Sequence, residues 1–355
     1  MKIGMMGGWN TDSGASFHTE LVGRAWVEQG HNLKVFSFFD YAFHGTQITG
    51  RDENYVSRCF TVDGFQPANF DPIPFLTTDY EVFVAQDLGM LPKDSLGKIF
   101  HRIKNKAITI NVIHDGKLSQ NPSFYQFDWD VIVCFDNRYR DFLIKAYEPS
   151  RVHIIPYPCC PWQPGNKQAA RSKLGLPQDK KIIYGFGPAS EYIAELIDPI
   201  IELSKEYPIM LLITAKKDNV VEKFKALQSE GIIDIELREE SLPISTLYDY
   251  LYAADVLVFN KPAAGHVVVS STAFQCMGSG CPIVARSSDY VEYYHNELIG
   301  YSNFDEFKSA LRSIFNEDAD FQSTIRAAEE YVNKNSAQEI GKKFIKLFEA
   351  ITEHR

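Results

Sequence analysis

The residues SSTAFQCMGSGCPIVARSSDYVE, from Ser270 to Glu292, decide how the rest of the chain is interpreted. The stretch opens with three hydroxyl residues that favour a helix N-cap, and apolar residues then recur at helical spacing. Glycines at 278 and 280 end this pattern, and the apolar run 283–285 has the length of a short buried strand. The stretch therefore predicts a helix, a tight glycine turn and a strand.

The residues upstream add a second strand and the loop that leaves it. Residues 254–259 predict a buried strand, and residues 261–265 predict the loop. Free backbone N–H groups and the positive end of a helix dipole attract an anion, and a diphosphate suits such a place. Ser270, Ser271 and Thr272 are therefore candidate anion ligands. The alternative is an ordinary capped helix packed on a sheet.

The composition is that of a globular protein. The chain has 355 residues, of which 45% are hydrophobic, so its size favours two domains over one. The formal net charge of −10 argues against a general nucleic-acid-binding surface, which relies on many lysines and arginines. An anionic small ligand would need a local basic pocket.

The cysteines and the N-terminus indicate a cytoplasmic location. The six cysteines include no CxxC pair and no finger-like histidine spacing, which argues against a zinc site and a disulfide framework. A reducing cytoplasm is the simplest home for them. The first residues, MKIGMMGGW, predict a strand that ends in glycines, unlike a signal peptide. No run is long enough to span a bilayer, and peripheral membrane contact stays open.

The first forty residues predict a βαβ unit. Residues 2–6 form its first strand, 7–16 a loop rich in glycine and hydroxyl groups, 17–29 a helix and 33–37 the second strand. The loop has neither the GxGxxG fingerprint nor a Gly-Lys-Ser/Thr ending. A nicotinamide site and a P-loop are therefore both poorly supported.

The alternation continues after an irregular segment at 40–78. Buried strands at 81–85, 107–113 and 131–135 are separated by helical patterns at 95–104 and 138–147, which indicates a parallel sheet covered by helices. One of these strands runs directly into His114. Because active sites of open α/β sheets lie at carboxyl strand ends, His114 is a candidate site residue.

Four prolines within residues 156–164 mark a linker, and a second series of the same design follows it. We expect an α/β fold with two Rossmann-like doubly wound domains that face each other across a cleft, the default ligand site. The expected domains are 1–156 and 157–336, with a C-terminal helix at 337–355 packing back on the first. Predicted strands of the second series are 181–184, 209–214, 233–237, 256–259 and 283–285, and its predicted helices are 191–206, 220–231 and 244–253.

In this order the motifs resemble the retaining nucleotide-sugar glycosyltransferases of the GT-B fold, in particular the group called family four. The resemblance covers essentially the whole chain. The segments that carry it are Ser13-Gly14-Ala15, Glu28-Gln29-Gly30-His31, Ile113-His114-Asp115, residues 151–156, residues 171–177, residues 252–258, and residues 278–285 followed by Glu292.

The resemblance implies that the second domain binds a nucleoside-diphosphate sugar, such as a UDP- or GDP-sugar. The first domain would hold the acceptor, a sugar, glycan or lipid-linked molecule. By this resemblance Gly14 and Ala15 approach the donor phosphates, His114 lies beside the transferred sugar, and the helix that starts at 270–272 points its N-terminus at the diphosphate. No metal and no further cofactor are required.

The chain also departs from the family pattern. Where relatives carry a Glu-x7-Glu element, this sequence has Val267 and Gln275, and Gln275 can bond a ribose hydroxyl without a charge. The Arg and Lys that usually follow the first strand of the second domain are absent from Gly185–Tyr192. A basic side chain should compensate. The candidates are Lys261, our first choice, then Lys216, Lys217 and Arg286.

The remaining candidates are single polar residues, each with an ordinary loop or surface role as its alternative. His266 and Glu292 are candidate donor contacts, and Asp12, His18 and Asp40 are candidate acceptor contacts. Three functions stay open. The leading hypothesis is a retaining glycosyltransferase; the others are a non-catalytic nucleotide-sugar-binding or scaffold protein and a sugar-nucleotide epimerase.

Overall fold

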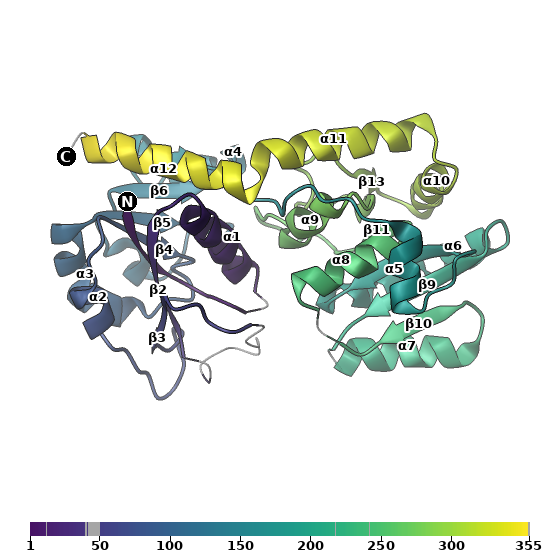
Figure 1. Cartoon of the computed structure of the whole chain (residues 1–355), viewed down its shortest axis with the longest axis horizontal. Coiled ribbons are helices and arrows are strands. Elements are labelled where there is room, and N and C mark those ends of the chain that lie inside the picture. The colour runs from purple at the N-terminus through teal and green to yellow at the C-terminus, as the bar shows by residue number, and fades with distance from the viewer. Residues whose placement is uncertain (12, 40, 42–49, 217, 241, 354–355) are drawn as a thin grey trace. The chain divides into compact units, whose positions relative to one another are not determined.

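The computed structural model describes residues 1–11, 13–39, 41, 50–216, 218–240 and 242–353. Their contacts separate the chain into two units. The first comprises Met1–Pro158, His266–Val268 and Asn335–Arg355, and the second comprises Cys159–Gly265 and Val269–Lys334. Figure 1 shows the helices and strands of both.

The first unit is built on a parallel sheet of seven strands in the order β3-β2-β1-β4-β5-β6-β7. Its strands are short and apolar, and β4 and β5 are buried along their whole length, as expected for a sheet covered on both faces. They are β1 (Lys2–Met6), β2 (Asn32–Phe38), β3 (Val56–Phe60), β4 (Val82–Gln86), β5 (Ile108–Val112), β6 (Val131–Cys134) and β7 (Val152–Ile154).

Neighbouring residues of β1 point to opposite faces of this sheet. A Cβ at Gly23 would lie 2.7 Å from Met5 Cε, so α1 packs closely over one face. On the other face the ring of Phe36 stacks on Phe75, 4.3 Å away. The helices are α1 (Gly14–Glu28), α2 (Ile73–Thr77), α3 (Lys93–Lys106), α4 (Asn137–Leu143) and α12 (Ala337–Glu353), with 3-10 turns η1 (Pro122–Tyr125) and η2 (Pro149–Arg151).

The C-terminal helix α12 packs against α1 (Figure 1). Trp26 Nε1 donates to the Gly341 carbonyl at 3.3 Å, and the Trp26 ring meets those of Phe344 and Phe348 edge-on. Gly341 lies where the helices approach, since a Cβ there would be 3.1 Å from Ala25 Cβ. The last helix is thus part of the first unit's core.

The second unit contains a parallel sheet of six strands in the order β10-β9-β8-β11-β12-β13. Its core includes Leu211, Val256 and Phe307, all fully buried. The strands are β8 (Lys181–Phe186), β9 (Ile209–Thr214), β10 (Ile235–Arg238), β11 (Val256–Phe259), β12 (Ile283–Arg286) and β13 (Ile299–Tyr301). The helices are α5 (Lys167–Leu174), α6 (Ile197–Ser204), α7 (Asp218–Glu230), α8 (Ile244–Ala253), α9 (Ser271–Cys276), α10 (Phe304–Phe315) and α11 (Ala319–Asn335), with 3-10 turns η3 (Pro188–Leu196) and η4 (Met277–Ser279).

The predicted α/β fold with two doubly wound sheets is confirmed. The predicted helix 191–206 is wrong in its first half, which is the 3-10 turn η3 followed by α6. Ile193 and Leu196 lie three residues apart and are both buried, a spacing that suits three residues per turn. The strand β13 was not predicted, because three residues carry too little pattern.

Candidate functional site

The strand order gives each sheet one switch point, where connections turn in opposite directions. In the first sheet it lies between β1 and β4, and in the second between β8 and β11. Open α/β sheets bind ligands just beyond the carboxyl ends of the strands at such a point. The side chains at these two edges are therefore the candidates for a site, and each edge is described separately.

At the first edge, β4 ends in Gln86 and His114 follows β5 by two residues. The side chain of Gln86 is 1% exposed, and its Oε1 lies 3.1 Å from His114 Nε2. Gly7 keeps this edge compact, because a Cβ there would lie 2.8 Å from Gln86 Cβ. The predicted position of His114 at a strand end is confirmed. Its role beside the transferred sugar stays a prediction.

His18 projects from α1 toward the same edge. Its ring meets those of His114, Tyr157 and Phe135 at centroid distances of 5.1, 5.1 and 5.3 Å. The residue is 0% exposed, and within the described residues neither ring nitrogen has a hydrogen-bond partner. The acceptor contact predicted for His18 stays a prediction, and this buried position favours an indirect role through His114.

Both histidines are held neutral. Burial lowers the pKa of His114 to about 3. Burial, and then repulsion by His114, lowers the pKa of His18 well below its usual value. Neither ring therefore carries a charge at neutral pH, so neither pairs ionically with a phosphate.

Two carboxyl groups that the sequence analysis did not propose as site residues lie at this edge: Asp87 directly follows Gln86, and Asp115 directly follows His114. A Cβ at Gly89 would be 3.1 Å from Asp87 Oδ1 and 3.2 Å from Asp115 Oδ1, so the two carboxyls flank this glycine. Burial, followed by repulsion from Asp115, raises the pKa of Asp87 to about 7. Burial also raises the pKa of Asp115. The signal that could have found Asp87 is its place directly after a buried strand.

Gly14 and Ala15 form the first turn of α1. The Ser13 side chain caps this helix by accepting from the Ser16 N–H, and the first turn contains no acidic residue. The Tyr157 hydroxyl donates to the Gly14 carbonyl at 2.6 Å. The Ser13 cap and the Tyr157 hydroxyl thus both hold this first turn. Because the turn has no carboxylate, no negative charge within it would repel an anion bound at its N–H groups.

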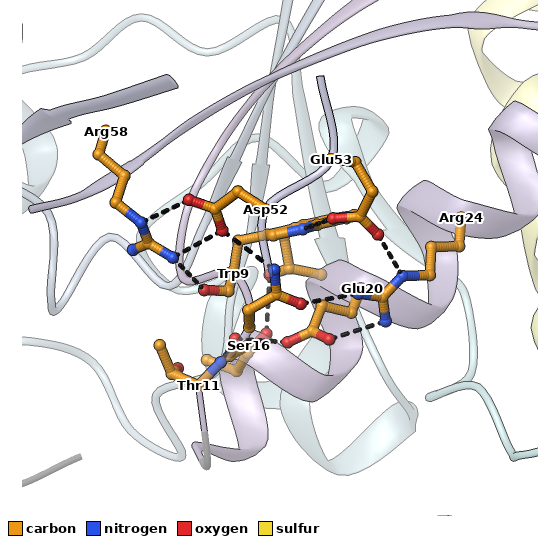
Figure 2. Close-up of polar contacts among 11 residues, drawn as sticks. Trp9, Thr11, Ser16, Glu20, Arg24, Asp52, Glu53 and Arg58 are labelled. Carbon is orange, nitrogen blue, oxygen red and sulfur yellow. Dashed lines mark hydrogen bonds and ion pairs between the residues drawn. The ribbon is translucent and has the colours of Figure 1, made fainter. Parts of the chain in front are cut away.

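The loop that leads into this turn is held by charged side chains (Figure 2). Arg24 donates to Glu20 and Glu53 at 2.8 and 2.9 Å, and Trp9 Nε1 donates to Glu53 at 2.8 Å. The Ser16 hydroxyl donates to Glu20 and accepts the N–H of residue 11. Burial raises the pKa of Glu20 despite Arg24. The loop is therefore shaped by side chains on α1 and in the segment before β3.

A second part of this network fixes Asn10, which has a positive φ of 51°. Its amide donates to Asp52 at 3.0 Å and its carbonyl accepts from Arg24 at 2.8 Å. Asp52 in turn pairs with Arg58, which also donates to the Trp9 carbonyl (Figure 2). Because both faces of the Asn10 amide are engaged, the strained backbone at this position is held. The predicted residues Asp12 and Asp40 lie outside the described residues.

His266 belongs to the first unit together with residues 267 and 268. A Cβ at Gly116 would lie 1.6 Å from the Val267 carbonyl and 2.7 Å from His266 Cδ2, so only glycine allows this approach. Arg138 Nη2 donates to the Val268 carbonyl at 3.2 Å. The structure thus places His266 beside the chain that follows His114, which the sequence alone did not indicate.

At the second edge a small recess lies between β8 and β11. Aromatic rings from the carboxyl ends of both strands, Phe186 and Phe259, line it together with the hydroxyl residues Ser190 and Thr272. Ala189, Leu257 and Val258 complete the lining. This mixture of apolar walls and a few polar groups is typical of a small-molecule site. Of the predicted donor contacts, Thr272 lies in it.

Ser270 caps α9, as predicted. Its side chain accepts the N–H of Ala273, and the residue is 3% exposed. The helix proper ends at Cys276, a 3-10 turn follows, and Gly280 closes it with a φ of 75°. Ser271 and Thr272 form the first turn and are half-buried. The Ser270 hydroxyl is therefore committed to the cap, and the N–H groups after it remain the anion-binding candidates.

The loop after β11 is clamped by two consecutive residues that the sequence analysis missed. The Asp289 carboxylate accepts the N–H groups of Ala264 and Gly265, each at 2.7 Å. The Lys261 ammonium lies over the Tyr290 ring, 4.2 Å from its centroid. Lys261, our first choice for a compensating cation, is thus held in place by the turn after β12.

The other predicted donor residues are more scattered. Gln275 is half-buried, and its backbone carbonyl accepts from the Tyr248 hydroxyl at 3.0 Å. Glu292 is exposed. Arg286 pairs with Glu195 at 3.2 Å, Lys216 is exposed, and Lys217 lies outside the described residues. Of these residues, the described ones, Gln275, Glu292, Arg286 and Lys216, do not line the recess described above.

Among the described residues there is neither a metal-ligand cluster nor a membrane-spanning helix. In the described ranges no group of three or more His, Cys, Asp or Glu side chains is arranged to hold a metal ion. All six cysteines are free and buried. No described helix is both long and apolar enough to cross a bilayer.

No protein-family model matches the sequence. Solved structures resemble the chain over nearly its whole length. They include sucrose-phosphate synthase from Thermosynechococcus elongatus, with a TM-score of 0.70, 12% identity and 100% of both chains covered. HepE from Anabaena, in complex with UDP-glucose, has a TM-score of 0.67 and 14% identity, with 99% of this chain and 100% of that chain covered.

The catalytic domain of starch synthase IV from Arabidopsis thaliana, bound to ADP and acarbose, is also similar. Its TM-score is 0.67 at 10% identity, with 99% of each chain covered. The resemblance to these three structures shows that the chain shares their fold. The GT-B fold expected from the sequence motifs is therefore confirmed.

Proposed function

We propose that the chain is a glycosyltransferase that moves a sugar from a nucleoside-diphosphate sugar to an acceptor hydroxyl with retention of configuration. The observation that carries this proposal is the recess at the β8–β11 switch point, with Phe186, Phe259 and Thr272 around it. Two proteins of the same fold were solved with UDP-glucose and with ADP and acarbose, by the descriptions of their structures. We therefore propose that the nucleotide of the donor binds at this recess.

The diphosphate would lie at the amino end of α9, against the N–H groups of Ser271 and Thr272. A helix terminus contributes about 0.3–1 kcal/mol toward an exposed anion, which is too little for two phosphates. Lys261 supplies a positive charge from the loop that Asp289 and Tyr290 hold. Gln275, His266 and Glu292 are proposed as further donor contacts, with Gln275 bonding a ribose hydroxyl.

Transfer forms a bond between the acceptor oxygen and the anomeric carbon while the bond from that carbon to the diphosphate breaks, and the proton of the acceptor hydroxyl passes to the leaving diphosphate. The negative charge grows on the leaving diphosphate, so donors fixed in advance lower the barrier. In this proposal Gly14 and Ala15 add their N–H groups to that charge, and no metal, further cofactor or protein nucleophile takes part. His114 contacts the transferred sugar and is the proposed catalytic residue.

The first unit, as the acceptor domain, would hold a sugar, a glycan or a lipid-linked molecule. Asp12 and Asp40 are proposed for that contact, and His18, which is fully buried, is proposed to act on the acceptor site indirectly through His114. A UDP- or GDP-sugar is the proposed donor, bound by the second unit. A cytoplasmic location with peripheral membrane contact fits a lipid-linked acceptor.

A panel of UDP-, GDP- and ADP-sugars tests the proposal by release of the nucleotide. We expect turnover with at least one donor when acceptor sugars are present, and loss of turnover in His114→Ala. If no donor in the panel binds and none is turned over, the proposal is wrong. Analysis of the product anomer would test retention.

A nucleotide-sugar-binding protein without activity is the second candidate. The residues at the carboxyl end of β8 favour this candidate. They are Gly185, Phe186 and Gly187, and none of these residues has a cationic side chain that could neutralise a diphosphate there. This candidate predicts saturable nucleotide binding with no release of nucleotide under any acceptor condition. Isothermal titration beside the turnover assay separates the two functions.

A further inference from the structure

We propose that Gln86 is a positioning residue that fixes His114 as its Nε2–H tautomer, so that Nδ1 is presented as a hydrogen-bond acceptor for a ligand hydroxyl. The identity of that ligand as a sugar rests on the proposed function. The tautomer does not, because it follows from contacts within the first unit.

The orientation of the Gln86 amide is the first step. Gln86 is the last residue of β4, and its Nε2 lies 3.9 Å from the Met5 Sδ of the neighbouring strand. Sulfur of a thioether only accepts hydrogen bonds, so the amide nitrogen belongs on that side. The carbonyl Oε1 then faces His114 Nε2 at 3.1 Å. A carbonyl oxygen accepts only, and Nε2 must therefore carry the hydrogen.

The protonation state of the ring is the second step. Burial lowers the pKa of His114 to about 3, so one ring nitrogen bears a hydrogen at neutral pH and the other does not. With Nε2 protonated, Nδ1 keeps its lone pair. In the described part of the chain Nδ1 takes part in no hydrogen bond, and the residue is half-buried.

The surroundings preserve this state. The ring of His18 approaches from α1 at 5.1 Å and 87°, and that of Phe135 from the end of β6 at 5.0 Å and 75°. His18 is itself neutral. The carboxyls on this edge are Asp115, the next residue, and Asp87, and burial raises the pKa of both. The groups that face the ring therefore favour a neutral imidazole.

A lone pair selects its ligand. Nδ1 accepts a hydrogen bond from a hydroxyl or an ammonium group, whereas a phosphate oxygen has no hydrogen to give. His114 is thus suited to a sugar hydroxyl and unsuited to the diphosphate. Gln86 is 1% exposed, and its polar atoms face Met5 and the His114 imidazole, close enough to the buried His18 ring to affect the pKa of that ring as well. It therefore acts on a ligand indirectly, through His114.

The test is the 15N spectrum of His114 in the full chain labelled at histidine, recorded from pH 5 to 8 without ligand. We expect a protonated Nε2, an unprotonated Nδ1 and no titration. In Gln86→Leu the accepting carbonyl is lost, and we expect a mixture of tautomers. In Gln86→Glu the accepting oxygen returns with a charge, and we expect a protonated Nε2 whose ring begins to titrate. Gln168→Leu, an exposed residue of α5, is the matched control and should leave the signals unchanged.

A wild-type ring protonated at Nδ1, or one that becomes a cation within this range, would overturn the proposal. So would Gln86→Leu with the unchanged wild-type tautomer. The wild-type spectrum decides even if a variant fails to fold. Since no donor or acceptor is present, the result is independent of transferase activity. Where turnover exists, Gln86→Leu should lower kcat/KM on the order of 10-fold, the worth of one hydrogen bond, while Gln168→Leu should not.

Discussion

Nη2 of Arg171 lies 2.7 Å from Oδ2 of Asp255, and the two side chains are only 4% and 8% exposed. The same carboxylate accepts the N–H of Ile182 at 2.7 Å, and the guanidinium donates to the Ala253 carbonyl at 2.9 Å. This pair joins α5 and the turn between α8 and β11 to the switch-point strand β8. Two segments that carry the family resemblance in the sequence are thus joined by one buried ion pair.

Removal of one partner should destabilise the second unit. Arg171→Met removes the buried guanidinium, and the Asp255 carboxylate then keeps its ion pair with the more exposed Lys167, 2.8 Å away. We therefore expect a loss below the value of about 3–5 kcal/mol for a buried charge left without any partner, but above that of a surface pair. Urea denaturation should show this decrease in the free energy of unfolding. The control is Lys173→Met, which removes the more exposed pair with Asp249 and should cost about 0–1 kcal/mol. Equal effects of the two substitutions would contradict the role given to Arg171.

Substitution of His18 by Phe should leave the stability unchanged or raise it. Both ring nitrogens are buried without partners, and such a group costs about 1–3 kcal/mol that an apolar ring of similar shape avoids. Thermal unfolding of His18→Phe checks the prediction. His18→Ala, which leaves a cavity among the surrounding rings, should instead lower the melting temperature. A His18→Phe variant as unstable as His18→Ala would show that the nitrogens are satisfied in solution.

Asp87 should make the protein less stable as the pH rises from about 4 to about 7. Its folded pKa of about 7 lies above the unfolded value, so between these values the folded state binds the extra proton. Raising the pH through this window removes that proton and the stability with it. Asp87→Asn should flatten this slope and gain about 1–2 kcal/mol relative to wild type at pH 8.

Chemical denaturation at several pH values measures the difference between the two proteins. Asp141→Asn, an exposed aspartate of α4, is the control and should follow the wild-type slope. If the free energies of unfolding of wild type and Asp87→Asn differ by a constant amount from pH 4 to 8, the pKa of Asp87 is not raised in the folded protein.

Asp289 should hold the loop that carries Lys261. Asp289→Ala removes the acceptor of the Ala264 and Gly265 N–H groups, so these amides should exchange with solvent about 10-fold faster. Hydrogen exchange followed by NMR measures this directly. Asp305→Ala, whose side chain is 92% exposed, should leave both amides unchanged. Unchanged exchange in Asp289→Ala would show that other contacts hold the loop.

The sequence predicted the fold well where strands are buried and helices are regular. The strands at 2–6 and 209–214 are found with the predicted bounds, because continuous apolar runs bounded by turn residues define them. The order of the strands could not be predicted, since hydrophobic runs do not specify which strands pair. Yet that order decides where the switch points lie, and with them the edges at which ligands bind.

The site was predicted less completely. His114 and Thr272 lie at the two edges, because strand ends and helix starts leave a sequence signal. Gln86 and Asp289 were missed. Each matters through a partner far away in the sequence, 28 residues for Gln86 and His114 and 25 for Asp289 and Ala264, and no local pattern marks such a pair.

The most direct test of the central claim is nucleotide binding to a chain whose β8–β11 recess is filled. Ala189 lines the recess, so Ala189→Trp should occupy it, while Ala226→Trp on the exposed face of α7 is the control. In isothermal titration with UDP, GDP and ADP, we predict that at least one nucleotide binds wild type and the control, and that Ala189→Trp weakens its affinity about 10-fold or more, a loss of about 1.4 kcal/mol. Equal affinity in all three proteins, or no binding to wild type by any of the nucleotides, would contradict the account.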